Sequence, residues 1–447
     1  MEHNRVLIVG TIPYNKNTSS RAFDAYFHNW EKKNMRQIFS NTKTPVKGHC
    51  GSLYQITDHR LLKRWLHRIK EVGVIFEDKD LPDDWTDTDL EVGSGTVNYL
   101  YKIGSKDSPL KYILRGILWK KKYWNTEKLN AWLDEFQPEC VFLAFSDDYF
   151  IPRIALYVSK KYNIPIMSCI GDDYYFNDRK SFSPFYHIYR RTYKHLIDQV
   201  FQRPGSAMYI GNKIRDKYNA VFGLHGETIY LTSDIQRHSF RQIDTEHPRI
   251  LYCGNIRLGR NQSLADIGYA LQRINKGYYV DVYSAEKDET YIHVLKDCPG
   301  VRFHGAVPYT DVMRLTEESD VTIIVEGFSK QDVDTTRYSL STKAADAIAS
   351  GGNIFVYGDI NCGVIEYMQQ SGCAVVCTDQ DKLEASLRQL IFDPKLQHHL
   401  YERAIVVDQE DHDKEKNRTL TEQMFVQLIE DTRKKHEEQA IRANQQL

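Results

Sequence analysis

Short apolar runs alternate with amphipathic segments along most of the chain. In the first half, the runs at 6–9, 141–145 and 164–170 predict buried strands, and the segments 19–30 and 152–162 predict helices. The second half repeats the pattern, with strands predicted at 249–253, 279–283, 301–304, 321–325, 353–357 and 373–377, and helices at 263–274, 311–318, 341–350, 364–370 and 382–391. Continuous apolar strands separated by helices indicate parallel sheets covered on both faces. The sequence therefore predicts an α/β fold with two Rossmann-like domains facing each other across a cleft.

The polar segment 234–247 interrupts this pattern and predicts a linker. We expect an N-terminal Rossmann-like domain at 1–240 and a C-terminal Rossmann-like domain at 248–405. Residues 406–447 are charged and helical without an apolar core, so they are expected to pack back on the first domain.

Composition narrows the class of protein. The 447 residues are 41% hydrophobic and 27% charged, which excludes wholesale disorder and a multi-pass membrane protein. Lys plus Arg (59) nearly cancels Asp plus Glu (60), so the chain lacks the basic excess of proteins that coat nucleic acid. No nucleic-acid partner is expected, and a homo-oligomer is retained as a hypothesis.

The eight cysteines form no CxxC pair, which argues against zinc-ribbon and thioredoxin-type sites and favours reduced, buried thiols. No apolar run approaches the roughly 20 residues that cross a bilayer, and the N-terminus leads directly into a strand. These features predict a cytoplasmic protein.

Several motifs of other enzyme classes are missing. Neither opening strand is followed by GxGxxG, and GxxxxGK[ST], HExxH and GxSxG do not occur. Hydride transfer, P-loop chemistry and hydrolysis at these motifs are therefore disfavoured.

A basic turn, Gly254-Asn255-Ile256-Arg257-Leu258-Gly259-Arg260, follows the first strand of the second half, where open α/β sheets bind ligands. Ser341 begins a later helix, and Lys343 lies in its first turn, where a cation opposes the helix dipole. An anion bound by the free N–H groups and by Lys343 would explain this arrangement. A solvated lysine on a capped helix explains the spacing equally well.

Six segments of the second half resemble segments of a known enzyme family, in the same order along the chain. They are Gly254 to Arg260, Val301 to Gly305, Leu315 to Ile323, Asp346 to Gly351, Ile354 to Gly358 and Asn361 to Glu366. Together they resemble the nucleotide-sugar-binding half of GT-B glycosyltransferases of the retaining family-four type, as found in bacterial polysaccharide synthesis. Residues 37–39 and 171–176 resemble the same group more loosely.

The resemblance implies a nucleoside diphosphate sugar donor of UDP or GDP type, a glycan or lipid-linked acceptor, and no cofactor or metal. Arg260 and Lys343 are then expected to neutralise the departing diphosphate, and Asp346 to bind the ribose. The remaining expected donor contacts are Gly254, Asn255, Arg257, Ser341 and Thr342. Where the family has its first glutamate this chain has Tyr338, so Glu326 is the substitute candidate for holding the donor sugar.

Two sets of acidic residues offer other chemistry. The pairs Asp87/Asp89, Asp332/Asp334 and Asp411/Asp413 match DxD, but none directly follows a buried strand, so we interpret them as solvated carboxylates. Asp172 and Asp173 do follow a strand, and with Ser20 and Arg21 they are candidates for the acceptor side. A helix cap at Asp172 is an equal alternative.

The segment 112–124 mixes lysines with large apolar side chains. It fits either peripheral contact with an anionic membrane at the inner face or an amphipathic core helix, which is slightly favoured.

The chain is thus interpreted as a metal-independent, retaining hexosyltransferase. A sugar-nucleotide epimerase and a non-catalytic GT-B partner subunit remain as alternatives.

Overall fold

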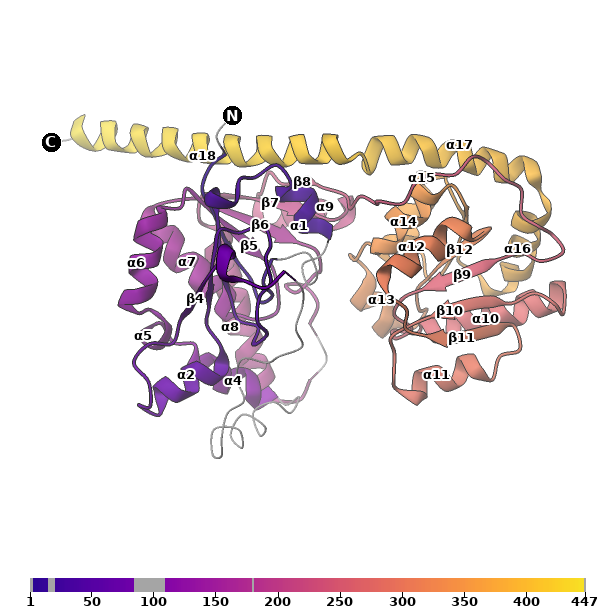
Figure 1. Ribbon diagram of the computed structural model, residues 1–447, viewed down its shortest axis with the longest axis horizontal. Coiled ribbons are helices and arrows are strands. Elements are labelled where there is room, and N and C mark those ends of the chain that lie inside the picture. The colour runs from indigo at the N-terminus through magenta and orange to yellow at the C-terminus, as the bar shows by residue number, and fades with distance from the viewer. Residues whose placement is uncertain (1–2, 15–20, 84–108, 179–180, 446–447) are drawn as a thin grey trace. The chain divides into compact units, whose positions relative to one another are not determined.

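The computed structural model describes residues 3–14, 21–83, 109–178 and 181–445. They form two compact units: Met1–Tyr209, Arg215–Thr228 and Glu415–Leu447 make up unit 1, and Ile210–Ile214 and Ile229–Lys414 make up unit 2. Figure 1 shows a sheet with helices packed against it in each unit. The predicted α/β class with two Rossmann-like domains is confirmed.

The chain passes between the units after residues 228 and 414 and also at 210–214, whereas the boundaries expected from the sequence were 240 and 405. The cause is the polar segment 234–247, which packs on unit 2. Arg237 donates to the Ile348 carbonyl oxygen at 2.8 Å, and Tyr401 donates to the His238 carbonyl oxygen at 3.1 Å. These contacts tie the expected linker to the second domain.

Unit 1 is built on an eight-stranded sheet in the order β4-β3-β2-β1-β5-β6-β7-β8, in which only the β3–β4 pair is antiparallel. The strands are β1 Val6–Val9, β2 Met35–Phe39, β3 Ser52–Gln55, β4 Val74–Glu77, β5 Cys140–Ala144, β6 Ile166–Ile170, β7 Gly205–Tyr209 and β8 Glu227–Thr228. The helices are α1 Arg21–Phe27, α2 Asp58–Trp65, α4 Pro109–Leu118, α5 Lys121–Trp124, α6 Glu127–Phe136, α7 Phe150–Tyr162, α8 Pro184–Phe201, α9 Asn212–Phe222 and α18 Lys414–Gln445. Residues 212–214 of α9 and the first residue of α18 belong to unit 2.

Both faces of this sheet are covered, because successive side chains of a strand point to opposite sides. Val141 and Leu143 of β5 belong to the core formed with α6 and α7. Between them, Phe142 meets Phe27 of α1 and Phe425 of α18 at ring-centroid distances of 5.0 and 6.2 Å. The C-terminal helix α18, yellow in Figure 1, thus supplies part of the core of unit 1.

Unit 2 has a six-stranded, all-parallel sheet in the order β11-β10-β9-β12-β13-β14. The strands are β9 Ile250–Cys253, β10 Val280–Tyr283, β11 Val301–Gly305, β12 Val321–Val325, β13 Asn353–Tyr357 and β14 Val375–Cys377. The helices are α10 Arg260–Ile274, α11 Glu289–Lys296, α12 Tyr309–Glu318, α13 Lys330–Thr336, α14 Thr342–Ser350, α15 Gly363–Ser371, α16 Leu383–Phe392 and α17 Pro394–Asp411.

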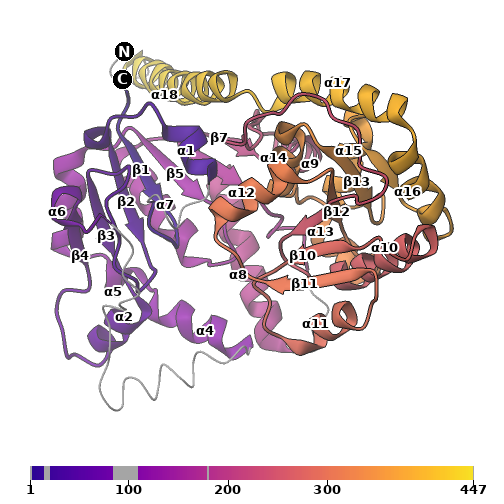
Figure 2. The same ribbon diagram turned by 45° about the vertical axis from the view of Figure 1, so that its right-hand side comes forward.

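The central strands of unit 2 are buried on both faces. Phe355 of β13 lies in the core shared with α10 and α16, whereas Val356 lies in the core shared with α14 and α15. Figure 2 shows α10 and α16 with this sheet. This double burial explains why these strands read as continuous apolar runs in the sequence.

The sequence pattern located the six strands of unit 2 and five of its helices to within a few residues, but it missed α11, α13 and most of α17, and it also missed strands of unit 1. Strands β3 and β4 lie where the sequence pattern predicted no strand, and β4 is only partly buried. Within the described residues, no helix is long and apolar enough to cross a bilayer.

Candidate functional site

Candidate residues for ligand binding gather at the carboxyl edge of the unit 2 sheet. The turn 254–259 follows β9, Glu326 follows β12, and Lys343 lies in the first turn of α14. Because the strands are parallel, their carboxyl ends share one edge, where open α/β sheets bind ligands. We call Tyr252, Arg260, Glu326 and Lys343 the Lys343 cluster.

Lys343 packs directly over the backbone of Gly254. A Cβ atom at Gly254 would lie 2.0 Å from Cε of Lys343, and Gly254 has a φ of +148°, which disfavours other residues. The Lys343 ammonium donates to the Tyr252 hydroxyl at 3.3 Å and lies 4.9 Å from the centroid of its ring. Glycine at 254 therefore makes room for the lysine.

The ammonium of Lys343 has an unusual environment. Burial, together with the nearby positive charge of Arg260, lowers the pKa of Lys343 to about 8, although Glu326 acts in the opposite direction. A bound anion would stabilise the charged form of this group. The arrangement favours the anion-binding interpretation over the solvated-lysine alternative.

Arg260 and Glu326 form a buried bidentate ion pair. The guanidinium donates from Nε at 3.0 Å and from Nη2 at 2.8 Å to the two carboxylate oxygens, and the Glu326 side chain is only 3% exposed. Both oxygens of Glu326 are thus engaged by Arg260. Glu326 is therefore placed to orient this guanidinium. The sequence had suggested a different role for it, holding the donor sugar.

The turn after β9 is shaped by Asn255, whose Oδ1 accepts a hydrogen bond from the Arg257 backbone N–H at 2.7 Å. Arg257 itself points to Glu286, donating from Nη2 at 2.9 Å, and this contact lowers the pKa of Glu286 to about 2. Leu258 and Gly259 both have positive φ values, which bring the chain round to the start of α10 at Arg260.

Helix α14 begins with a side-chain cap. The Ser341 hydroxyl accepts from the Lys343 backbone N–H at 3.4 Å, and the adjacent Thr342 is exposed. One turn further, the buried Asp346 accepts a hydrogen bond through Oδ1 from the Ser233 hydroxyl at 2.6 Å. Ser233 lies in the segment that enters unit 2, and no pattern in the sequence pointed to it.

The carboxylates of unit 1 have structural contacts. Oδ1 of Asp173 accepts from the Phe176 backbone N–H at 2.9 Å and from the Tyr218 hydroxyl at 2.8 Å, and burial raises the pKa of Asp173. The Asp172 carboxylate accepts a hydrogen bond from the Tyr174 hydroxyl, and its backbone carbonyl oxygen accepts from the Tyr174 N–H at 3.1 Å. Ser20 and the side chain of Arg21 lie outside the described residues.

The DxD pairs have other partners where they are described. Asp332 accepts from the Ser329 hydroxyl at 2.6 Å, Asp334 pairs with Arg337 at 3.0 Å, and Asp411 accepts from Tyr367 at 2.9 Å. Asp87 and Asp89 lie outside the described residues. Among the described side chains, no group of three or more His, Cys, Asp or Glu residues is arranged to hold a metal ion.

The segment 112–124 contributes its tryptophans to the core of unit 1. Trp119 stacks on Phe150 with ring centroids 3.9 Å apart, and Trp124 donates through its ring N–H to the Trp119 carbonyl oxygen at 3.1 Å. Both indoles are buried. This placement supports the core-helix interpretation for the aromatic residues, whereas Lys120, Lys121 and Lys122 are exposed.

Solved structures with the same fold are found despite low sequence identity. The glycosyltransferase WaaG, involved in lipopolysaccharide biosynthesis, matches with a TM-score of 0.52 and 11% identity over 94% of this chain and 99% of its own. Anabaena HepE, solved with UDP, matches with a TM-score of 0.56 and 11% identity over 95% and 100% of the two chains. Sucrose-phosphate synthase of Thermosynechococcus elongatus matches with a TM-score of 0.55 and 9% identity over 95% and 99%.

No protein-family model matches the chain, and no curated protein matches its sequence. The structural matches show that the chain has the GT-B fold. The fold implied by the sequence resemblance is confirmed.

Proposed function

We propose that this protein is a glycosyltransferase that moves a hexose from a nucleoside diphosphate sugar to a hydroxyl of a glycan or a lipid-linked acceptor. The observation that carries the proposal is the Lys343 cluster, in which two cations and the N-terminus of α14 converge at the carboxyl edge of the unit 2 sheet. The GT-B fold supports it, since WaaG and HepE, with UDP-glucose bound in one HepE structure, have this fold.

In the proposed reaction, the bond between the anomeric carbon and the diphosphate breaks, and the acceptor oxygen bonds to the same carbon with retained configuration. The proton of the acceptor hydroxyl passes to the departing diphosphate. Negative charge grows on the departing diphosphate. The guanidinium of Arg260, oriented by Glu326, and the ammonium of Lys343 stabilise this charge without a metal. The backbone N–H groups at the start of α14, next to Ser341 and Thr342, add further donors.

Other residues of the same edge position the donor. Asp346, oriented by Ser233, accepts hydrogen bonds from the ribose hydroxyls in this proposal. Gly254 and Asn255 shape the turn against which the diphosphate lies, and Arg257 flanks it. For the acceptor, Asp172 and Asp173 in unit 1 are both retained as candidates, and Asp173 is held in place by the Phe176 backbone N–H and by the Tyr218 hydroxyl of α9.

Nucleotide binding and transfer test the proposal separately. Calorimetric titration with UDP and GDP should show one binding nucleotide, and Lys343→Met should weaken it, whereas the exposed Lys330→Met should not. UDP-glucose incubated alone and with acceptor glycans is then followed by chromatography that separates sugar-nucleotide epimers, coupled to mass spectrometry. Formation of an epimer of UDP-glucose without an acceptor would identify an epimerase, and the absence of nucleotide binding would overturn the donor site.

Metal independence is tested by chelation. Transfer should continue at an unchanged rate in excess EDTA, because cationic side chains stabilise the diphosphate in this proposal. A loss of activity that Mn²⁺ or Mg²⁺ restores would contradict the assigned roles of Arg260 and Lys343.

A further inference from the structure

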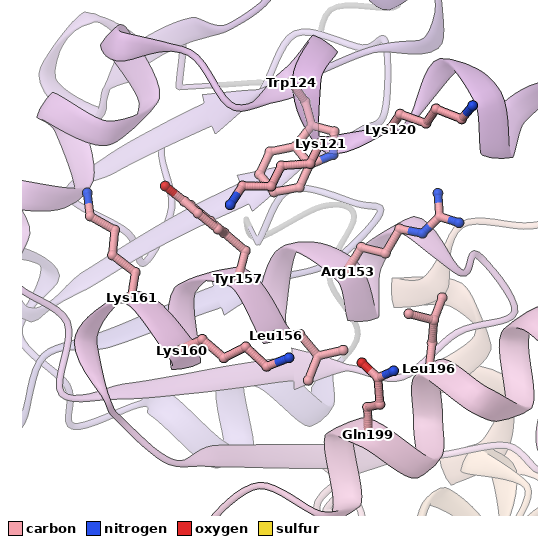
Figure 3. Close-up of a pocket in the computed structure, with 10 residues that line it drawn as sticks. All are labelled: Lys120, Lys121, Trp124, Arg153, Leu156, Tyr157, Lys160, Lys161, Leu196 and Gln199. Atoms are coloured by element: carbon pink, nitrogen blue, oxygen red, sulfur yellow. The ribbon is translucent and has the colours of Figure 1, made fainter.

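We propose that a second anion site lies in unit 1 and binds the phosphate group of an organic phosphate. A pocket of about 610 Å³ opens between the α5 region, α7 and α8 (Figure 3). Its lining residues are Lys120, Lys121, Trp124, Arg153, Leu156, Tyr157, Lys160, Lys161, Leu196 and Gln199. We call it the basic pocket; it involves no residue of the Lys343 cluster.

Helix α7 presents one cationic face to the pocket. Arg153, Tyr157 and Lys160 follow one another at intervals of four and three residues, which places them on the same side of the helix. Ile154 and Val158 lie on the other side, in the core of unit 1. Arg153 and Lys160 therefore lie on the side of α7 that faces the pocket, and Figure 3 shows Lys120 and Lys121 on the opposite, α5 side.

The positive charge of the pocket is poorly compensated. No carboxylate lines it, and of its five cations only Lys161 has an acidic partner within the described part of the chain, Asp134 at 2.6 Å. Arg153 donates to the Gly116 carbonyl oxygen at 3.0 Å, and burial lowers its pKa. Lys121 lies 4.4 Å from the centroid of the Tyr157 ring. Such a group of neighbouring cations favours an anionic ligand.

The pocket also specifies the kind of anion. A phosphate accepts several charge-assisted hydrogen bonds from ammonium and guanidinium groups at once. Leu156, Leu196 and the Tyr157 ring form an apolar wall beside the cations, which suits the carbon skeleton of a phosphate ester rather than a bare ion. The volume falls in the range of small-ligand sites. A soluble sugar phosphate and a lipid headgroup share this chemistry.

Lysine acetylation read by mass spectrometry tests the site residue by residue. The full chain carrying Lys343→Met is used, because this substitution weakens binding of the phosphate probes at the donor site. Two phosphate probes are used: glucose 1-phosphate, and vesicles that contain phosphatidic acid in phosphatidylcholine. Vesicles of phosphatidylcholine alone are the control for the second probe. We expect acetylation of Lys120 and Lys160 to slow at least threefold with one of the two phosphate probes, while Lys434 and Lys435 of α18 label at an unchanged rate.

Affinity is then compared between two variants with equal loss of charge. Lys120→Gln/Lys160→Gln should weaken binding of the protecting probe about tenfold. The control Lys434→Gln/Lys435→Gln, also exposed and in unit 1, should change it less than twofold. Protection by glucose 1-phosphate identifies a soluble ester, and protection by phosphatidate vesicles alone identifies a headgroup. Protection by neither probe, or equal weakening in both variants, would overturn the proposal.

Discussion

The Lys343 cluster and the basic pocket both gather positive charge, but they hold it differently. In the cluster, Arg260 is fixed by two hydrogen bonds to the buried Glu326, and Lys343 lies against Tyr252 over a glycine. In the basic pocket, four of the five cations have no acidic partner within the described residues, and three of these are exposed lysines.

The difference matters because a fixed charge and a free charge suit different tasks. A preoriented cation stabilises charge that develops during a reaction without having to reorganise. Exposed lysines attract an anion but remain mobile, and salt screens them. We therefore expect the cluster to influence catalysis and folding, and the basic pocket to influence binding alone.

The largest expected effect is on stability and follows from Arg260→Met. The substitution leaves the Glu326 carboxylate buried without its partner, which costs about 3–5 kcal/mol. Urea denaturation should show this loss in the free energy of unfolding. The control Arg314→Met removes one partner of an ion pair with Glu318 that is exposed on both sides, and it should leave the transition nearly unchanged. Equal effects of the two variants would mean that burial does not distinguish these pairs.

Lys343→Met should act on the reaction. Loss of a charge-assisted hydrogen bond to the diphosphate removes about 1.5–3 kcal/mol, or roughly 10- to 150-fold in rate. We expect kcat as well as donor affinity to fall, while the unfolding transition changes little. A variant that keeps full kcat would exclude Lys343 from contact with the leaving group.

The pH dependence of donor binding provides a third comparison. The lysine is charged below its pKa of about 8 and loses its charge above it, so donor affinity should fall as the pH rises through 8. Arginine stays protonated throughout, so in Lys343→Arg this decrease should disappear. Calorimetry of UDP binding between pH 6.5 and 9.5 measures both profiles. An unchanged decrease in the arginine variant would assign the titration to another group.

Among the variants of the proposed donor site, Asp346→Asn is expected to have the smallest effect. The amide keeps an acceptor for the Ser233 hydroxyl but weakens the bond to the ribose by about 1 kcal/mol, or roughly fivefold. Because the ribose contact is equal in the ground and transition states, the donor KM should rise while kcat stays constant. A fall in kcat without a change in KM would contradict the ribose assignment.

The hydrophobic pattern determined the layered α/β fold because the central strands are buried on both faces, as Phe355 and Val356 illustrate. It did not reveal β4, whose residues are only partly buried, so no continuous apolar run marks it. The pattern also located Arg260 and Lys343 at the starts of helices, since those positions follow from local periodicity, whereas Asp346 was singled out by the family resemblance.

Only the tertiary structure decided what these residues contact. Glu326 and Arg260 are 66 positions apart, and Ser233 and Asp346 are 113 apart, so no local pattern could pair them. The basic pocket likewise joins residues near 120, along α7 and on α8. Local sequence determines where a strand ends or a helix turns, because those choices depend on neighbouring residues. The partners of a charged side chain depend on how distant segments pack, and only the folded chain brings them together.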